Sequence, residues 1–295
     1  MNTRDLHFRS NRVRDILTLF HEELDGIYGN GEVSVFCDML FEAFLGWDKV
    51  RLLTSKEQTI DQSDLLRFHW ALEDLKQYRP IQHIIGYTDF CGCRIKVNSD
   101  VLVPRPETEE MVSSLTPSPS PTGEGCKMLD LCTGSGCIAI ALKKAFPQAD
   151  VTAVDVSEQA LAIAKQNAVC NNTPVNFLQA DILAIDCQLP AVNYQLIISN
   201  PPYVMEKERL QMQRNVLDYD PALALFVPDD DPLRFYRAIA NMAKQHLAKD
   251  GLLVVEINET LAVDTASLLK DCGFSTEVHT DFRGKQRWIS AVLNP

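Results

Sequence analysis

In the second half of the chain, short apolar runs that suit β-strands alternate with stretches whose spacing suits helices. The first part of this pattern predicts strands over residues 127–132, 151–156, 175–179 and 195–199, with helices over 137–146 and 158–170. A helix over 232–247, a strand over 252–257 and a final strand pair over 274–278 and 287–293 follow. Nearly continuous apolar strands separated by helices are typical of a parallel sheet covered on both faces, with right-handed crossovers. The pattern therefore predicts an α/β fold.

The first part of the chain has a different period. Over residues 13–78 apolar side chains recur every three or four positions, which is the spacing of amphipathic helices. Ser34 and Ser63 are the expected N-caps of two of these helices. Trp47 and Trp70 are expected in the core. This part of the chain is therefore predicted to be a small helical domain.

The two patterns are joined by a short segment of strand-like character. Residues 81–103 carry alternating apolar residues broken by Gly, Asn, Ser and Asp, and they are predicted to form a hairpin. Residues 116–125 are rich in Pro, Ser and Gly, so we expect a mobile surface loop. A chain of this length usually exceeds one core. We therefore expect a helical domain at 1–80, a hairpin linker at 81–103 and a main domain at 104–295.

The charge and the cysteines narrow the classes of partner and compartment. The 28 Lys and Arg against 40 Asp and Glu give a formal charge of −12, which disfavours non-specific nucleic-acid binding. No apolar run is long enough to span a membrane, and the first residues lack the pattern of a secretory signal. The nine cysteines lack the paired spacing of a zinc site, so we expect reduced thiols, no metal and a cytoplasmic protein.

Small and acidic residues stand at the ends of the first three predicted strands. The first strand is followed by the loop residues Cys132, Thr133, Gly134, Ser135 and Gly136. Glycine lets the backbone approach a ligand closely, although the full G-x-G-x-x-G fingerprint of dinucleotide-binding proteins is missing. Asp155 and Asp181 follow the next two strands, where a carboxylate can bind ribose hydroxyls or an adenine amino group, or can cap a helix. Together the three strand ends favour an adenosine-containing ligand.

The most informative motif is Ser-Asn-Pro-Pro-Tyr at residues 199–203, directly after the fourth strand. Pro201 and Pro202 stiffen the backbone and remove two N–H donors, which leaves carbonyl acceptors at a rigid corner. The Asn200 side-chain oxygen and the Pro201 carbonyl can each accept one hydrogen of an NH2 group, while the Tyr203 ring can lie on a planar substrate. A structural turn with a strand-end Asn is the alternative interpretation.

These motifs resemble those of the class I S-adenosylmethionine-dependent methyltransferases, and specifically the release factor glutamine methyltransferase family. The resemblance rests on Gly-Tyr-Thr-Asp-Phe-Cys-Gly at 86–92, Pro-Arg-Pro-Glu-Thr-Glu at 104–109, the loop at 130–136 and Asn-Pro-Pro-Tyr at 200–203. It covers nearly the whole chain. It implies a Rossmann-like domain with a mostly parallel seven-stranded sheet, preceded by a helical N-terminal domain and a connecting β-hairpin.

The resemblance also implies roles for individual residues. The loop 132–136 is expected to contact the methionine part of S-adenosylmethionine, with Asp155 at its ribose and Asp181 at its adenine. Asn200 is expected beside both cofactor and substrate, and residues 200–203 are expected to hold the substrate glutamine. Arg105 and Glu109 are expected either to contact the substrate or to form an ion pair that pins the hairpin to the sheet.

One residue departs from the family pattern. Cys132 stands where the family usually has a glycine, so a positive φ at this position is in doubt. A reactive thiol beside the cofactor is one reading of this cysteine, and a small residue that fills a tight bend is the other.

The function implied is methyl transfer from S-adenosylmethionine to the N5 nitrogen of a glutamine in peptide chain release factors, with the helical domain gripping the protein substrate. Methylation of a glutamine in a ribosomal protein is the first alternative. Such relatives typically have Ser-Pro after the arginine that corresponds to Arg105, whereas this chain has Pro-Glu-Thr-Glu at 106–109, which favours release factors. An adenine N6 methyltransferase acting on nucleic acid also remains open, as does a non-catalytic binding module on the same fold. No membrane and no direct nucleic-acid partner is expected.

Overall fold

The computed structural model describes residues 8–115, 125–185, 187, 189–190 and 192–294. Apart from Gly125, the loop predicted at 116–125 lies outside the described residues. The chain divides into two compact units, one comprising the residues up to Gly86 together with Arg214–Tyr219, and the other the remaining residues from Tyr87 onward. Each unit is described by itself.

The first unit is helical. Its elements are α1 (Val13–Tyr28), α2 (Asn30–Leu45), α3 (Lys49–Thr54), α4 (Gln62–Lys76), α5 (Ile81–Ile85) and the later segment α9 (Arg214–Leu217). On α1 the buried side chains recur every three or four residues at Val13, Ile16, Phe20 and Leu24. This stripe packs with buried residues of α2 and α4 into one core. Helix α9 is held there by Tyr219, whose hydroxyl donates to the Gln77 carbonyl at 2.8 Å.

Three details of the first unit differ from the sequence predictions. The N-cap of α2 is Gly29 and that of α4 is Asp61, so Ser34 and Ser63 lie inside the helices. The Ser34 hydroxyl donates to the carbonyl of Asn30 one turn earlier, a helix-interior bond that serines also form. Trp47 is buried as expected, but the side chain of Trp70 is 55% exposed. The spacing of apolar residues therefore predicted where the helices lie, but it did not predict at which residue each helix begins or which side chains it buries.

The second unit opens with a hairpin of β1 (Tyr87–Phe90) and β2 (Cys93–Lys96), followed by α6 (Pro106–Ser114). The first residues of the predicted hairpin, 81–85, form helix α5 instead. The hairpin is fastened to the rest of the unit by Asn167, which is fully buried. Its side chain bonds both the N–H and the carbonyl of Lys96, at 2.8 and 3.0 Å, and donates to the Ser135 carbonyl at 2.9 Å.

The seven-stranded sheet of the second unit has the order β10-β11-β9-β6-β3-β4-β5. Its strands are β3 (Lys127–Leu131), β4 (Asp150–Asp155), β5 (Asn176–Gln179), β6 (Tyr194–Ser199), β9 (Leu247–Glu256), β10 (Phe274–Thr280) and β11 (Gln286–Leu293). The five strands from β9 to β5 are mutually parallel, while β11 is antiparallel to both of its neighbours. The predicted mostly parallel seven-stranded sheet is confirmed.

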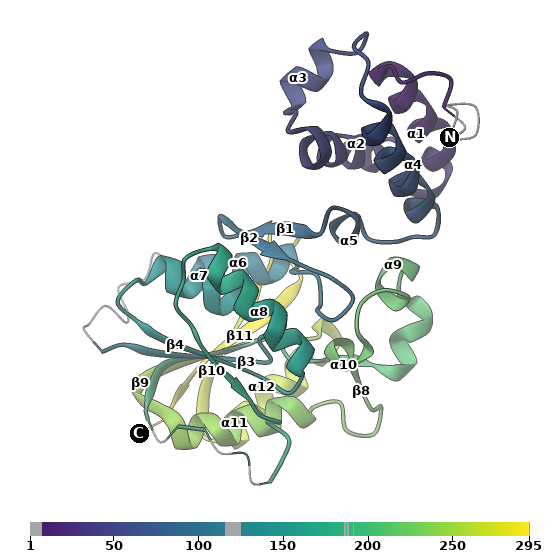
Figure 1. Cartoon of the computed structure of the whole chain (residues 1–295). Helices are drawn as coiled ribbons and strands as arrows, with labels where there is room; N and C mark the ends of the chain where they lie inside the picture. Colours follow the sequence, from purple (N-terminus) through teal and green to yellow (C-terminus); the bar gives the residue numbers. More distant parts are fainter. Residues whose placement is uncertain (1–7, 116–124, 186, 188, 191, 295) are drawn as a thin grey trace. The chain divides into compact units, whose positions relative to one another are not determined.

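Helices cover both faces of this sheet (Figure 1). On one face lie α6, α7 (Cys137–Ala145) and α8 (Glu158–Cys170), and on the other lie α11 (Arg234–His246) and α12 (Ala262–Asp271). Each face has its own apolar core, one including Ile138 and Ile140 of α7 and the other Tyr236 and Ile239 of α11. Burial on both faces explains why the sheet strands read as continuous apolar runs.

Between β6 and α11 the chain forms short elements for which the sequence carried no periodic signal. They are β7 (Val204–Met205), the 3-10 helix η2 (Glu206–Gln211), α9, α10 (Ala222–Leu225) and β8 (Phe226–Val227). A second 3-10 helix, η3 (Glu259–Leu261), precedes α12. Within the described residues, no helix is both long and apolar enough to cross a membrane.

Candidate functional site

The strand register aligns the chemically important residues along one edge of the sheet. Leu131 of β3 pairs with Val154 of β4 and with Ser199 of β6, and Ser199 in turn pairs with Val255 of β9. On each of these strands the next residue is polar or small: in the order β9, β6, β3 and β4 these residues are Glu256, Asn200, Cys132 and Asp155. Because all four strands are parallel, these residues meet at their carboxyl ends, where open α/β sheets bind ligands.

A tight loop joins β3 to α7 at this edge. Cys132 has a φ of +61° and Gly136 a φ of +81°, both in the left-handed region. A Cβ added at Gly136 would lie 3.0 Å from the Cβ of Ala164 on α8, so glycine is required there for helix packing as well. The positive φ that the sequence left in doubt at Cys132 is present, and the cysteine adopts it at a cost of about 1 kcal/mol.

Asp130, the next-to-last residue of β3, holds this loop in place through hydrogen bonds. This aspartate was not singled out from the sequence. Its carboxylate is fully buried and accepts the Thr133 hydroxyl at 2.5 Å and the Ala139 N–H at 3.2 Å. Burial raises the pKa of Asp130 to about 7, which these two donors partly counteract. The residue thus fixes the loop to the first turn of α7. An acidic residue inside an otherwise apolar strand was the available signal.

Asp155 at the end of β4 binds two backbone amides with its two oxygens. The N–H of Gly134 donates to Oδ2 at 2.8 Å and the N–H of Ser157 donates to Oδ1 at 2.9 Å. Burial raises the pKa of Asp155 above its ordinary value, and the backbone donors oppose the rise. Each carboxylate oxygen has further lone pairs, so Asp155 can accept hydrogen bonds from a pair of neighbouring hydroxyls.

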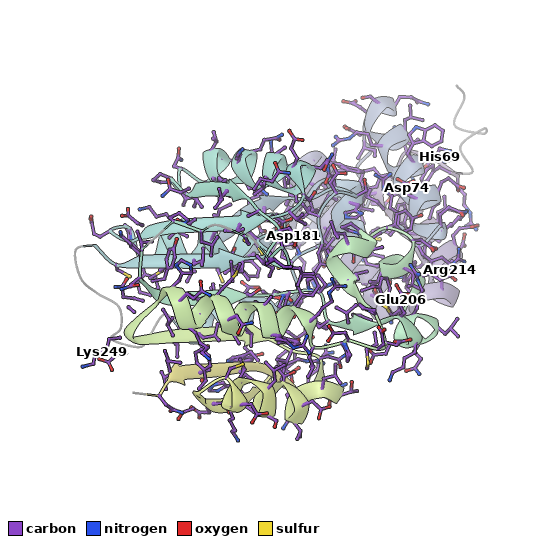
Figure 2. The ribbon with its side chains drawn as sticks, turned by 90° about the horizontal axis from the view of Figure 1, so that it is seen from below. His69, Asp74, Asp181, Glu206, Arg214 and Lys249 are labelled. Carbon is purple, nitrogen blue, oxygen red and sulfur yellow. The ribbon has the colours of Figure 1, made fainter. Side chains whose placement is uncertain are left out.

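A cavity runs along this edge of the sheet, and Asp155 lines it together with Gly134, Asp181 and Asn200. Asp181 lies in the loop after β5, labelled in Figure 2, and its Oδ1 accepts the Leu183 N–H at 2.9 Å. The rest of the wall is mainly apolar. It includes Leu102, Ile138, Val156, Ile182, Leu183 and Phe235. Carboxylate acceptors within a mainly apolar wall suit a nucleoside with a flat base, so the residues present fit an adenosine-containing cofactor.

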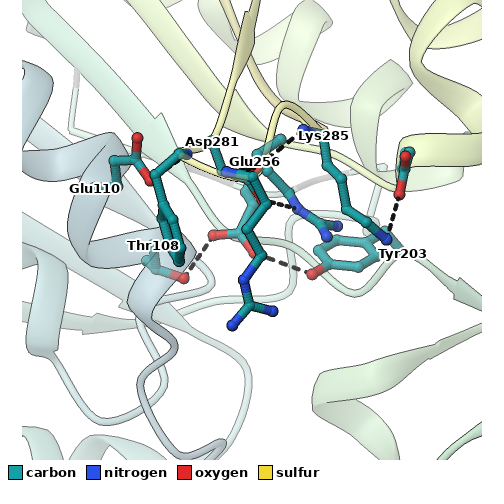
Figure 3. Close-up of polar contacts among 10 residues, drawn as sticks. Thr108, Glu110, Tyr203, Glu256, Asp281 and Lys285 are labelled. Carbon is teal, nitrogen blue, oxygen red and sulfur yellow. Dashed lines mark hydrogen bonds and ion pairs between the residues drawn. The ribbon is translucent and has the colours of Figure 1, made fainter.

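The Asn-Pro-Pro-Tyr corner follows β6, and a polar cluster behind it holds both of its polar side chains. Nδ2 of Asn200 donates to the Thr108 hydroxyl at 3.1 Å, and Thr108 donates to Oε2 of Glu256 at 2.6 Å. The Tyr203 hydroxyl donates to Oε1 of the same carboxylate at 3.0 Å. Figure 3 shows Thr108 and Tyr203 on either side of Glu256. Thr108, Asn200 and Pro202 all line the cavity, and the Thr108 hydroxyl connects this wall to Glu256, which does not line it.

Glu256 is 2% exposed, and its burial raises the pKa of its carboxyl to about 7. The hydrogen bonds from Thr108 and Tyr203 favour the charged form and limit the rise. Burial together with the nearby carboxylate also raises the pKa of the Tyr203 hydroxyl well above its ordinary value. Tyr203 is therefore a neutral donor across the physiological range.

The side chains of Arg105 and Glu109 have different partners, although the Glu109 N–H donates to the Arg105 carbonyl at 3.1 Å. Nη2 of Arg105 contacts Oδ2 of Asp220 at 2.6 Å, and Oε1 of Glu109 accepts the Cys91 N–H of the hairpin at 2.6 Å. Neither residue is among those that line the cavity. Each ties two segments of the second unit together, so the two residues do not form an ion pair with one another.

The Cys132 thiol also has a defined environment. Burial, with Asp155 as the next cause, raises its pKa well above the ordinary value for a thiol. Thiolate is the reactive form of cysteine, so this environment disfavours chemistry at Cys132. The side chain packs at the margin of the core that also contains Leu131 and Val154.

Thr108 and Glu256 are the members of the site that sequence reasoning missed. Thr108 was noted only as part of a family stretch. Glu256 ends an apolar strand, as Asp155 does, and the same strand-end rule would have selected it. The strand predicted at 252–257 contains Glu256 instead of ending at it, and no glycine loop follows, so this carboxylate did not stand out as a ligand-binding group.

Comparison with known proteins gives matches over both parts of the chain. Residues 108–219 match the family model described as "Methyltransferase small domain", and residues 21–86 match the "PrmC N-terminal domain". A protein of Flavobacterium psychrophilum named release factor glutamine methyltransferase is 40% identical over 282 residues, covering 94% of this chain and 98% of that protein. A protein of Bacteroides thetaiotaomicron with the same name is 38% identical over 277 residues, with the same coverage of both chains. With the strand-end cluster and the fold already described, these matches show that the chain belongs to the release factor glutamine methyltransferase family.

Proposed function

We propose that this protein transfers a methyl group from S-adenosylmethionine to the N5 amide nitrogen of a glutamine in a peptide chain release factor. The observation that carries the proposal is the Asn200 side chain at the cavity wall, with its amide nitrogen bonded to Thr108. Its oxygen is thereby directed away from Thr108. Curated relatives named for this activity cover almost the full length of the chain.

In this proposal the cofactor occupies the cavity along the sheet edge. Asp155 accepts hydrogen bonds from its ribose hydroxyls, and Asp181 binds its adenine from the loop after β5. The backbone of residues 132–136 holds its methionine part. When bound there, S-adenosylmethionine supplies an electrophilic methyl group on a sulfonium.

The substrate amide is a poor nucleophile because its nitrogen lone pair is delocalised into the carbonyl. The chain therefore works by placement: Asn200 Oδ1 and the Pro201 carbonyl each accept one hydrogen of the NH2 group. This holds the nitrogen in one orientation and polarises both N–H bonds. The Tyr203 ring and the stiff Pro202 shield the amide from water. The extra proton leaves after transfer, so no strong general base is required.

The test is replacement of Asn200 by Ala. We expect methylation of a purified release factor to fall by about 10²-fold, while the Kd for S-adenosylmethionine measured by calorimetry stays unchanged. Labelled methyl donor followed by peptide mass mapping identifies the modified residue. Equal turnover in the variant, or a label on a residue other than glutamine, would contradict the proposal.

We further propose that the helical unit recognises the release factor. One glutamine offers too little surface to specify a protein partner, and Trp70 presents a large side chain that is 55% exposed. Trp70→Ala is expected to raise the KM for the release factor and to leave cofactor affinity unchanged. Val263→Ala, at a 78% exposed position on α12, serves as the matched control. An unchanged KM in the Trp70 variant would count against this role.

The remaining parts of the proposal concern partners and compartment. A cytoplasmic location agrees with a substrate that acts in translation and with the lack of disulfides among the described residues. A formal charge of −12 argues against nucleic acid as the methyl acceptor. Pro106 and Glu107 follow Arg105 here, where ribosomal protein methyltransferases typically have Ser-Pro, which argues against a ribosomal protein as substrate. Retention of DNA or RNA on a filter at moderate salt would reopen the adenine alternative.

A further inference from the structure

The Asn-Pro-Pro-Tyr corner depends on one buried carboxylate that lies on a different strand. Glu256 ends β9, and its two oxygens separately accept the hydroxyls of Thr108 and Tyr203, at 2.6 and 3.0 Å. Thr108 in turn accepts the Asn200 amide at 3.1 Å. Figure 3 shows the carboxylate between its two donors. Both polar side chains of the corner are therefore connected to Glu256, one directly and one through Thr108.

The chemistry of these groups fixes the direction of each hydrogen bond. An ionised carboxylate carries no hydrogen, so it can only accept. A threonine hydroxyl has a single hydrogen, and in Thr108 that hydrogen is used on Glu256. The Thr108 oxygen then has only lone pairs to offer Asn200, which must present its NH2 group rather than its carbonyl oxygen. As a result Asn200 Oδ1 is left for another partner.

We propose that Glu256 is a positioning residue for methyl transfer, whose ionised carboxylate sets the orientation of the Asn200 amide through Thr108 and holds the Tyr203 ring directly. This inference rests on the proposed function, because it assigns a purpose to the freed Asn200 oxygen: acceptance of a hydrogen from the substrate carboxamide. Glu256 itself is not among the residues that line the cavity. The Glu256 carboxylate acts by disfavouring the flipped orientation of the Asn200 amide. In that orientation the Asn200 NH2 group would face the substrate NH2 group, and two donors cannot form a hydrogen bond with each other.

Protonation of Glu256 removes this directionality. A carboxylic acid can donate to Thr108, which then can turn its own hydrogen toward Asn200 and stabilise the flipped amide. The groups that face Glu256 are Glu107 on α6 and Arg287 on β11, together with Tyr203. Tyr236 of α11 donates to the backbone carbonyl of Glu256 at 3.2 Å, and the Glu256 charge contributes to the raised pKa of Tyr236.

In the part of the chain that the structure describes, Glu256 forms no ion pair. The pKa-lowering charge of Arg287 acts on it, but Arg287 is itself paired with Asp281, with Nε 2.9 Å from Oδ2. The pKa of Glu256 is raised to about 7, chiefly by its burial. Its carboxylate therefore titrates near neutral pH, and the orientation of Asn200 is expected to weaken as the pH falls through this range.

The kinetic test compares variants that alter the hydrogen-bond direction with variants that preserve it. Glu256→Gln keeps the shape but adds donors, and Thr108→Val removes the hydroxyl; each should lower kcat by about 10²-fold with the cofactor Kd unchanged. Thr108→Ser restores the hydroxyl and should recover most of kcat. Glu277→Gln, at an exposed position on the edge strand β10, is the matched control and should behave as wild type. An unchanged kcat in Glu256→Gln overturns the proposal, as does a loss of cofactor affinity that matches the loss in kcat.

A second readout does not depend on turnover. The side-chain ¹⁵N–¹H signals of Asn200, assigned by their loss in Asn200→Asp, should shift with a midpoint near pH 7 in the wild type and lose this transition in Glu256→Gln. Titration that persists in Glu256→Gln, or signals that do not change with pH in the wild type, overturns the proposal. If the wild type methylates no release factor, the proposed function fails, while this titration still decides whether Glu256 orients Asn200.

Discussion

Arg105→Met is expected to destabilise the fold by leaving the Asp220 carboxylate unpaired. Of the residues that the structure describes, Arg105 is the only one that forms an ion pair with Asp220, whose side chain is nearly inaccessible to solvent. The Asp220 side chain is 1% exposed, whereas Arg105 is 33% exposed. Their contact of 2.6 Å joins the segment before α6 to the segment before α10. Methionine retains the apolar part of the arginine side chain, so the substitution mainly tests the charge.

The size of the effect follows from the unequal burial of the two partners. Breaking a fully buried ion pair by removing one side costs about 3–5 kcal/mol, and an exposed pair contributes under about 1 kcal/mol. Because Asp220 is buried and Arg105 is partly solvated, we expect Arg105→Met to lower the free energy of unfolding by about 2 kcal/mol at neutral pH.

The effect should depend on pH with a definite sign. Burial raises the pKa of Asp220 to about 6, and Arg105 opposes that rise. Below this pKa the folded protein carries Asp220 mostly protonated, so there is little ion pair left to lose. Above it the variant must either keep an unpaired buried carboxylate or take up a proton. The loss of stability should therefore be small at about pH 5 and grow as the pH rises to about 8.

Urea denaturation of both proteins at these two pH values measures the effect. Lys285→Met is the control, because Lys285 and Glu259 are 51% and 43% exposed and their pair should contribute under about 0.5 kcal/mol at either pH. A loss in Arg105→Met no larger than that of the control, and independent of pH, would refute a structural role. A raised KM for the release factor at unchanged stability would then favour substrate contact by Arg105.

Two further predictions address the cofactor site and the hairpin. Asp155→Ala should raise the Kd for S-adenosylmethionine by about 10²-fold, because hydrogen bonds to a charged group contribute about 1.5–3 kcal/mol; calorimetry measures this, and an unchanged Kd would contradict the ribose assignment. Asn167→Ala should lower the free energy of unfolding by about 2–3 kcal/mol, since two part-buried hydrogen bonds to Lys96 and one buried hydrogen bond to Ser135 are lost; urea denaturation showing less than about 1 kcal/mol would contradict it.

The sheet was predictable because its determinants are local in the sequence. Strands buried on both faces must be apolar throughout, and the helices between them must place an apolar face on the sheet. The helix at Glu158–Cys170 and the final strand ending at Leu293 have the bounds that the sequence gives them. The strand before Glu256 extends five residues further back, to Leu247, because the polar residues Lys249 and Asp250 interrupt the apolar run.

The helical unit was predictable in kind but not in detail. On α2 the apolar residues Val33 and Phe36 are buried, whereas Val35 between them is 52% exposed. Helix α2 is apolar around most of its circumference, so the spacing of its apolar residues does not predict which side of the helix is buried. Trp70 was assigned to the core on residue type alone, and its ring lies instead 5.0 Å from that of His69, with half its surface exposed.

The segment from 204 to 231 was not predictable, because its elements are too short to carry a period. β7 and β8 contribute two residues each, and they pair only because the chain returns more than twenty residues later. Asp220 within this segment reads as an ordinary loop residue. Only the fold places it against Arg105, 115 positions earlier in the chain.

The active-site cluster combines both kinds of residue. Asn200 and Asp155 are recognisable because each follows its own strand, and the parallel register alone brings them to one edge of the sheet. The Thr108–Glu256 contact spans 148 positions and joins a helix to a strand, so the sequence around either residue does not predict it. Motifs therefore identify the groups that can face a ligand. The groups that orient them are found only through the fold. In the proposed mechanism, Glu256, which no motif contains, acts through the single hydrogen of Thr108 to set which end of Asn200 faces the substrate.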